Sequence, residues 1–430
     1  MALKSLCLLP AWQKKKLSPQ SRMIKEYYCP DRCGHNAVCI KEELIIWGGY
    51  NENNGSTYCS NTALWVYKLD LDVWMQYKAT GRAPPKRSGA CSALLWPYWY
   101  IFCGHTYNGN GNDMYRLDLI NLNWEQVCVM EPSISPRDKA SSWVYGNRIY
   151  CFGGFGISPF TFLWDRDTDV FSEEAFTERG WNDQLLYFDT EKFEWIKVVC
   201  KGIKPKERAA HSTVCVGGNV YLFGGRHHSQ RLNDLHMLNL ETHTWSGRIP
   251  CHGIQPAGRS WHSMSRFSKT ELLLFGGFDN NRSSLDDIWL LNIVSFSWTV
   301  LINHTGLPRL WHTASVSVQG DVLIFGGCVN NILDEAGQMI TSDKVLVIRL
   351  QPFSLERLCL HTLSKHKDLT SSQWHVLSKP HQEWLSLKST SACEFSPPFY
   401  KNCAESVLGP HLCQLSVLTE KEVEVLNNSR

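Results

Sequence analysis

The sequence lacks several features that would each point to a particular class of protein. Its formal net charge is only +2, from 43 basic and 41 acidic residues, so neither nucleic acid nor a membrane is a favoured partner. No apolar run approaches the roughly 20 residues of a membrane-spanning helix. The 17 cysteines form no CxxC pair and no zinc-ligand cluster, and Cys29 and Cys33 come nearest to one. We therefore expect neither a metal nor a cofactor.

We also expect no secretion signal. The short apolar run at residues 6–12 contains Pro10, and three lysines follow it at residues 14–16. The odd number of scattered cysteines fits reduced, buried thiols, so we expect the protein in the nucleus and cytoplasm. With 43% hydrophobic and 20% charged residues, the chain can form a large core without disulfide bonds.

One pattern occurs six times. A strand-like apolar run ends in a glycine pair, and Cys103 replaces the first glycine in the second copy. The copies follow one another at intervals of about 50 residues, with one interval of about 70, and that period is typical of kelch propeller blades. The second glycines of the six pairs are Gly49, Gly104, Gly154, Gly225, Gly277 and Gly327.

Two further elements recur in a fixed order around the glycine pairs. The arginines of the preceding turns are Arg32, Arg87, Arg137, Arg208, Arg259 and Arg309. The tryptophans that end the strands after the first five pairs are Trp74, Trp124, Trp195, Trp245 and Trp298. We expect these indoles to fill the space between adjacent blades. Unrelated strands in a sandwich would not repeat three elements in one order, so the sequence predicts an all-β, six-bladed kelch propeller.

The repeats divide the chain into four parts. We predict a disordered segment over residues 1–22, the propeller over 23–353, a helical segment over 354–387 and a weakly ordered tail without an assigned role over 388–430. The sixth copy has no strand that ends in tryptophan. We therefore expect a strand at residues 23–28 to complete the last blade.

Several motifs resemble the family of kelch domain-containing proteins 1 and 2. They are RGWND around Trp181, FGGR followed by RLNDLHMLNL, GRSWHS, PRLWHT and FGGC, and the resemblance covers about residues 30–365. It implies a non-catalytic substrate receptor of a cullin-2 RING ubiquitin ligase, with elongin B, elongin C, cullin-2 and the RING-box protein as partners. One member of this family binds substrates that end in diglycine. The resemblance therefore implies that this chain takes part in the degradation of such proteins.

The resemblance also implies a pocket for the C-terminal end of a substrate. Its residues here are Arg226, Arg231, Ser260, Trp181, Trp261, Lys139 and Phe155. The two arginines and the serine would clamp the terminal carboxylate, since guanidinium forks match that planar anion. Phe155 stands where the family has a tyrosine, which removes a hydrogen bond worth about 1 kcal/mol. The long segment 156–180 is expected to form an enlarged loop over the same mouth.

Simpler roles are open for these residues. Arg226 and Arg231 could be solvated loop arginines, or they could pair with Asp234. Trp181 and Trp261 could pack between blades.

A helix is predicted after the last blade. Ser354 can cap it, Glu356 suits its first turn, and Leu355, Cys359 and Leu363 follow at i, i+4 and i+8 on one face. This order resembles an elongin-binding box, which would also include Leu358. The alternative is a helix that packs against its own propeller.

A cullin-selecting segment would follow the elongin-binding box. The candidate is residues 377–387, in which the contact residues would be Pro380, Trp384 and Leu385. Lys379 stands where an apolar residue usually precedes the proline.

Two other function classes compete with a ligase receptor. An enzyme would need a cluster of metal-binding or redox residues, but His227 and His228 are adjacent and would point to opposite sides of a strand. Four histidines repeat once per blade, which indicates a structural role: His35, His211, His262 and His312. A kelch scaffold that binds a folded partner would share the fold without needing the arginine clamp or the helix.

Overall fold

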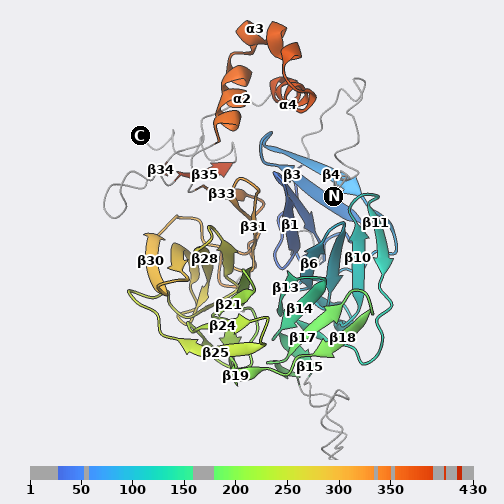
Figure 1. The fold of residues 1–430 in the computed structure, drawn as a ribbon, viewed down its shortest axis with the longest axis vertical. Helices are drawn as coiled ribbons and strands as arrows, with labels where there is room; N and C mark the ends of the chain where they lie inside the picture. The colour runs from blue at the N-terminus through green and yellow to red at the C-terminus, as the bar shows by residue number, and fades with distance from the viewer. Residues whose placement is uncertain are drawn as a thin grey trace, which may run out of the picture.

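The computed structural model describes residues 28–52, 58–157, 179–333, 338–349, 354–390, 401–402 and 414–418. Six sheets surround one axis, and each sheet corresponds to one sequence repeat (Figure 1). The predicted all-β, six-bladed propeller is therefore confirmed. No helix among the described residues is long and apolar enough to cross a membrane.

The first three blades are antiparallel sheets of four principal strands. Blade 1 contains β1 (Asn36–Ile40), β2 (Glu43–Trp47), β3 (Ala63–Lys68) and β4 (Val73–Lys78). Blade 2 contains β6 (Cys91–Leu95), β7 (Tyr98–Phe102), β10 (Met114–Asp118) and β11 (Asn123–Gln126), with β5 (Thr80–Gly81) parallel to β11 at its edge. Blade 3 contains β13 (Ser141–Tyr145), β14 (Arg148–Phe152), β17 (Leu185–Asp189) and β18 (Glu194–Lys197).

The other three blades follow the same plan. Blade 4 contains β20 (Ser212–Val216), β21 (Asn219–Phe223), β24 (Leu235–Asn239) and β25 (Thr244–Ile249), with β19 (Lys201–Ile203) parallel to β25. Blade 5 contains β27 (Ser263–Arg266), β28 (Glu271–Asp279), β29 (Ser284–Asn292) and β30 (Ser297–Ile302), and β26 (Arg259–Ser260) also pairs with β28. Blade 6 contains β31 (Thr313–Val316), β32 (Val322–Phe325), β33 (Val345–Arg349), β35 (Gln414–Leu418) and β34 (Lys401–Asn402).

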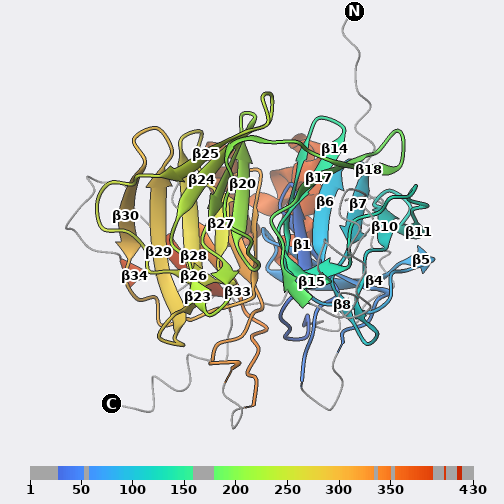
Figure 2. The ribbon, with the colours of Figure 1, turned by 90° about the horizontal axis from the view of Figure 1, so that it is seen from below.

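Short strands form small sheets outside the blades. They are β8 (His105–Thr106) with β9 (Gly109–Asn110), β12 (Arg137–Asp138) with β15 (Phe155–Ile157) and β16 (Arg179–Trp181), and β22 (Arg226–His227) with β23 (Gln230–Arg231). Figure 2 shows β8, β15 and β23 along the same, lower side of the molecule. This rim carries the residues considered below.

The ring closes through the innermost strand of each blade. These strands lie around the axis in the order β1, β6, β13, β20, β27 and β31, and β31 packs against β1. In addition, the second glycine of every pair donates its N–H to the carbonyl of the arginine of the next turn, at 2.8–3.0 Å, and Gly327 completes the circle by donating to Arg32. Gly49 illustrates why glycine is needed, because its φ is +94° and a Cβ there would lie 2.9 Å from a carbonyl oxygen.

The outer tryptophans pack between blades, as the sequence predicts. Each lies against the aromatic residue that precedes the glycine pair of the neighbouring blade, with ring centroids 5.0–5.4 Å apart. The five pairs are Trp74 with Phe325, Trp124 with Trp47, Trp195 with Phe102, Trp245 with Phe152 and Trp298 with Phe223. Blade contacts are thus built from one repeated aromatic pair.

The outer strand of blade 6 differs from the prediction. β33 pairs with β35 over five residues, so a strand from the C-terminal part of the chain takes this position. The predicted N-terminal strand, residues 23–28, falls outside the described residues except for Tyr28, which belongs to no strand. The assignment of this position to the N-terminal segment is therefore wrong. The outer strand of the blade is held by backbone hydrogen bonds, and these form equally well with a strand from either end of the chain.

Helices follow the last blade. α2 (Leu355–Lys365), α3 (Lys367–Thr370), the 3-10 helix η4 (Ser371–Val376) and α4 (Lys379–Thr390) lie beyond β3 and β33 at the top of Figure 1. α2 is anchored by Arg357, a buried residue whose guanidinium pairs with Asp70 of blade 1 and Asp321 of blade 6, both at 3.0 Å. Asp321 also binds Arg349 at the end of β33.

Candidate functional site

A second ring of backbone hydrogen bonds surrounds the axis at the rim. The residue two positions after each turn arginine has a φ of +54° to +61° and donates its N–H to the carbonyl of the preceding member, at 2.8–3.0 Å. The six members are Gly34, Gly89, Lys139, Ala210, Trp261 and Trp311. Because the ring has no gap, side chains from blades far apart in the sequence meet at one opening.

Three of these side chains lie close together at the opening. The Lys139 Nζ atom is 5.4 Å from the centroid of the Trp311 ring, and the Trp261 and Trp311 rings are 5.9 Å apart. Trp311 also covers Gly34, where a Cβ would lie 2.8 Å from the indole. All three line a cavity of about 270 Å³ that continues along the axis past His312. Arg226 and Arg231 do not line this cavity and lie outside it.

The two candidate arginines face each other in one small hairpin. Arg226 and Arg231 are direct partners in the register of β22 and β23. Arg231 is buried, its Nε donates to the Ser260 hydroxyl oxygen at 3.2 Å, and its guanidinium lies 4.6 Å from the centroid of the Phe278 ring. Ser260 is fully buried. The predicted arginine and serine set is therefore assembled in space.

Arg231 is a buried cation with no ion-pair partner among the described residues, although the nearby Asp279 carboxylate partly offsets the effects that lower its pKa. Its Nη2 is buried without a hydrogen-bond partner among the described residues, and no described carboxylate forms an ion pair with it. Burial and the nearby charge of Arg226 lower the pKa of Arg231. Asn280 fixes the backbone by accepting from the Arg231 N–H at 2.8 Å and donating to its carbonyl at 2.9 Å. A buried charge is costly unless paired, so this position suits an anionic ligand.

Asp234 does not supply that anion. Both of its oxygens bind the turn arginine Arg208, at 2.7 and 2.9 Å, and one also binds His236 at 2.8 Å. Although burial opposes ionisation, hydrogen bonds from Arg208 and His236 hold the pKa of Asp234 well below its usual range. The alternative pairing of Arg226 or Arg231 with Asp234 is therefore excluded by the structure.

An aromatic wall adjoins the hairpin. Phe155 and Trp181 are direct partners in β15 and β16, with ring centroids 5.0 Å apart, and the Trp181 ring lies 4.8 Å from that of His228. The carbonyl of His228 accepts a hydrogen bond from Arg226 Nε at 2.8 Å. The ring contacts of Trp181 are thus at the rim, whereas Trp261 also packs against the buried Phe278.

Lys139 connects the tryptophans at the opening with the aromatic wall of Phe155 and Trp181. Its Nζ pairs with the buried Asp138, which lies opposite Phe155 in the register of β12 and β15. The seven predicted residues therefore belong to one chain of contacts at the rim, in which Asp138, His228 and Trp311 are intermediates. No pattern in the sequence pointed to Asp138, Phe278 or Asn280, or to the place of Trp311 at the opening, although PRLWHT, which repeats the GRSWHS pattern, carried a signal for Trp311 itself.

The repeated histidines have the structural role expected of them. All four are buried, and burial lowers their pKa values, to about 3 for His211 and His312. His35, His211 and His312 each hydrogen-bond through Nε2 to a hydroxyl of a neighbouring blade, at 2.7–2.8 Å. These neutral rings hold blades together.

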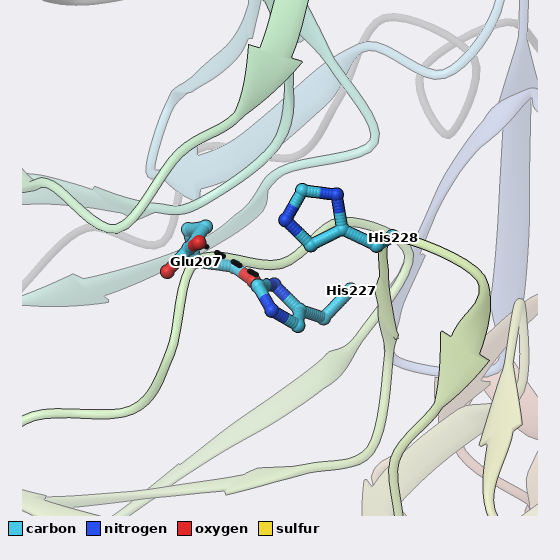
Figure 3. A group of neighbouring side chains, drawn as sticks. All are labelled: Glu207, His227 and His228. Carbon is cyan, nitrogen blue, oxygen red and sulfur yellow. Dashed lines mark hydrogen bonds and ion pairs between the residues drawn. The ribbon is translucent and has the colours of Figure 1, made fainter.

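The side chains of His227 and His228 lie next to each other, so the prediction that they point to opposite sides of a strand is wrong. His227 is the last residue of β22, whereas His228 lies in the following turn with a φ of +50°. Because His228 has left the strand, the alternation of side chains ends and the two ring centroids are 4.3 Å apart. Figure 3 shows both rings beside Glu207. The expectation that no cluster of metal-binding residues exists is therefore wrong for this part of the rim.

The predicted docking helix is present and carries an exposed apolar stripe. Ser354 caps α2 by accepting a hydrogen bond from the Arg357 N–H at 3.2 Å. Leu355 is 77% exposed and Leu358 45% exposed, Cys359 is exposed and Leu363 is half-buried. The alternative, a helix that packs against its own propeller, holds for the opposite face, which Arg357 attaches to blades 1 and 6, whereas Leu355, Leu358 and Cys359 remain exposed.

The three residues predicted to contact cullin differ from one another in exposure. Pro380 is exposed at the start of α4, and Trp384 is half-buried with its ring 5.4 Å from that of His361 in α2. Leu385 is fully buried. Its side chain is therefore not accessible to a partner in this conformation, in which α4 packs against α2.

Comparison with known proteins agrees with this architecture. The model of the KLHDC2/KLHL20/DRC7 Kelch-repeats domain matches residues 12–177 and 174–327. Kelch domain-containing protein 2 of Bos taurus is 38% identical over 368 residues, which cover 82% of this chain and 90% of that protein. Kelch domain-containing protein 1 of Mus musculus is 35% identical over 372 residues, which cover 84% of this chain and 89% of that protein. The chain therefore belongs to the KLHDC2/KLHL20/DRC7 family of Kelch-repeat proteins.

Proposed function

We propose that this protein is the substrate-recognition subunit of a ubiquitin ligase built on cullin-2, elongin B, elongin C and the RING-box protein. Its propeller binds the free C-terminal end of substrates that finish in diglycine, and the ligase directs them to the proteasome in the nucleus and cytoplasm. The protein has no catalytic role of its own in this assembly. Membership of the kelch family and the similarity to kelch domain-containing proteins 1 and 2 are consistent with such an adaptor.

The observation that supports the proposal most strongly is the buried cation at Arg231. Its Nη2 donor is unpartnered among the described residues, its Nε is bound to Ser260, and Arg226 lies directly opposite. A terminal carboxylate has two acceptor oxygens in one plane and one negative charge. It therefore satisfies the free donors and offsets the repulsion between the two guanidinium groups.

The walls favour a small residue at the chain end. Trp181 and Phe155 lie on one side of the arginine hairpin, and Ser260 continues directly into Trp261 on the other. Ring faces exclude water and strengthen hydrogen bonds to a buried carboxylate. Glycine lets the substrate backbone approach these walls without a side chain to place.

The link to a ligase rests on α2. An apolar stripe of two leucines and a thiol, with Leu355 77% exposed, suits insertion into the groove of a partner. Because Arg357 anchors the opposite face of the helix to blades 1 and 6, the stripe has a fixed direction relative to the propeller.

A reconstituted reaction tests the proposal. The chain is purified with elongin B and elongin C, combined with neddylated cullin-2 and the RING-box protein, and given a reporter that ends in Gly-Gly. We expect polyubiquitination of this reporter and none when one further lysine follows the glycines. Equal modification of both reporters would contradict recognition of the chain end, and binding of the reporter without elongin would leave a scaffold that acts outside a ligase.

A further inference from the structure

A second group of polar side chains lies at the rim beside the arginine hairpin. One ligand atom from each of Glu207, His227 and His228 lies within 4.8 Å of the others. Glu207 belongs to the turn that enters blade 4, immediately before Arg208, and the histidines belong to the hairpin that begins at Arg226. Figure 3 shows the two imidazole rings and the carboxylate on adjoining loops, directed toward a common region.

The local backbone sets the imidazoles in place. His227 Nδ1 lies 2.9 Å from the carbonyl oxygen of Glu207 and 3.6 Å from a carboxylate oxygen of the same residue, so the imidazole is held beside Glu207. In the tautomer with the proton on Nδ1, that proton is donated to the carbonyl and Nε2 keeps the lone pair that a metal requires. The left-handed conformation of His228 is uncommon for a residue with a side chain. It places a second imidazole next to the first instead of across the strand. The hydrogen bond of a ring nitrogen to a carbonyl is a usual accompaniment of metal-binding histidines.

The donor set selects one class of ion. Two imidazole nitrogens and one carboxylate oxygen are ligands that zinc accepts in sites with an open fourth position. Calcium and magnesium require oxygen ligands, so two histidines disfavour them. The exposure of the side chains, 40% for Glu207 and 18% for His227, gives an ion in solution a way to enter.

We propose that Glu207, His227 and His228 form a binding site for a divalent transition-metal ion of the zinc class. Binding draws the three ligand atoms together and joins the turn before Arg208 to the hairpin of Arg226 and Arg231. The positive charge of Arg226, one residue before His227, opposes a cation here. The affinity is therefore expected to be lower than that of structural zinc sites with four protein ligands.

The ion would also act on the peptide site, and this consequence rests on the proposed function. The ring of His228 lies 4.8 Å from that of Trp181, and its carbonyl accepts the Arg226 Nε hydrogen bond at 2.8 Å. A metal bound to His228 therefore holds the aromatic wall and one arginine of the clamp in place. Zinc is expected to strengthen the binding of a diglycine peptide.

Titration of the reduced full-length chain with zinc chloride tests the site. The wild type is expected to bind one more zinc ion than His228→Ala, and Glu207→Gln is expected to bind it at least about tenfold more weakly. His304→Ala serves as the control, because His304 is 87% exposed beside Asp286 on another blade. Equal stoichiometry and affinity in the wild type, His228→Ala and Glu207→Gln would overturn the proposal.

The cysteines require a second measurement, since thiolates also bind zinc. X-ray absorption at the zinc edge should show nitrogen and oxygen neighbours at about 2.0–2.1 Å for the ion that His228→Ala loses. A sulfur shell at about 2.3 Å for that ion would instead assign it to cysteines and contradict the site. Neither result depends on peptide binding, so failure of the metal site and failure of the proposed function are separate outcomes.

Discussion

Arg231 Nε donates a hydrogen bond of 3.2 Å to the hydroxyl of Ser260, a fully buried residue that follows 29 positions later in the sequence. The bond joins the β22–β23 hairpin at the rim of blade 4 to β26, which pairs with β28 of blade 5. It uses one donor of the guanidinium and leaves Nη2 without a partner among the described residues. The guanidinium of Arg231 is therefore already held in place by Ser260, and its Nη2 donor is left for an anion.

Phe155→Tyr tests the aromatic wall. The ring lies 5.0 Å from that of Trp181, and a phenol would add one hydrogen-bonding group beside the proposed peptide site. We expect a gain of about 1 kcal/mol in the binding free energy of a diglycine peptide, or about fivefold in Kd. Phe193→Tyr, distant from the rim in blade 3, is the control and should leave Kd unchanged. An unchanged Kd for Phe155→Tyr would mean that this position does not face the peptide.

The exposed stripe of α2 gives a separate prediction for the ligase partners. Leu355→Ser combined with Cys359→Asp should abolish co-purification of elongin B and elongin C, because a charge and a hydroxyl would enter the apolar interface. Peptide binding should persist, since the stripe belongs to the helical segment and the clamp to the propeller rim. Leu369→Ser, at an 81% exposed position in α3, is the matched control. Retention of elongin by the double variant would contradict the assignment of α2.

Arg357→Ala tests the anchor between α2 and the propeller. It removes a buried cation that pairs with Asp70 and Asp321 at 3.0 Å, and we expect the free energy of unfolding to fall by about 3 kcal/mol in urea. Lys192→Ala, which removes a 68% exposed partner of Glu194, should cost less than about 1 kcal/mol. Equal effects of the two substitutions would show that the Arg357 pairs contribute no more than a surface ion pair.

The buried histidines predict how stability depends on pH. Burial lowers the pKa of His211 to about 3, whereas the unfolded chain has a value of about 6.5. Between these values the unfolded state binds a proton that the folded state excludes. The free energy of unfolding should therefore fall as the pH falls below about 6.5, by about 1.4 kcal/mol per pH unit for each such histidine. His211→Gln should make this slope smaller by about one proton. Identical slopes in urea unfolding from pH 7 to pH 5 would refute this contribution.

The fold was predictable because its information is local and repeated. Each blade carries its own arginine turn, glycine pair and tryptophan, and the contact between Trp245 and Phe152 follows from the same rule as that between Trp298 and Phe223. The closure of blade 6 was not predictable in this way. A backbone ladder accepts any extended segment, and the sequence pattern does not say which end of the chain supplies it.

The site was predictable in part. Resemblance to a family supplied Arg231 and Ser260, but composition and spacing do not show that Asn280 fixes the backbone of Arg231 or that Asp138 neutralises Lys139. Those partners come from other loops. The pairing of His227 with His228 was mispredicted because strand alternation was assumed beyond the last residue of β22, where a single positive φ reverses it.

The most direct test of the central claim is the affinity of one peptide in two forms, a free acid and an amide, each ending in Gly-Gly. We expect the acid to bind the wild type and the amide to bind at least about 30-fold more weakly, and Arg231→Ala to reduce acid binding by at least about 2 kcal/mol. Arg248→Ala, on the outer strand β25, should bind the acid as the wild type does. Equal affinity for acid and amide would contradict recognition of a terminal carboxylate by Arg226, Arg231 and Ser260.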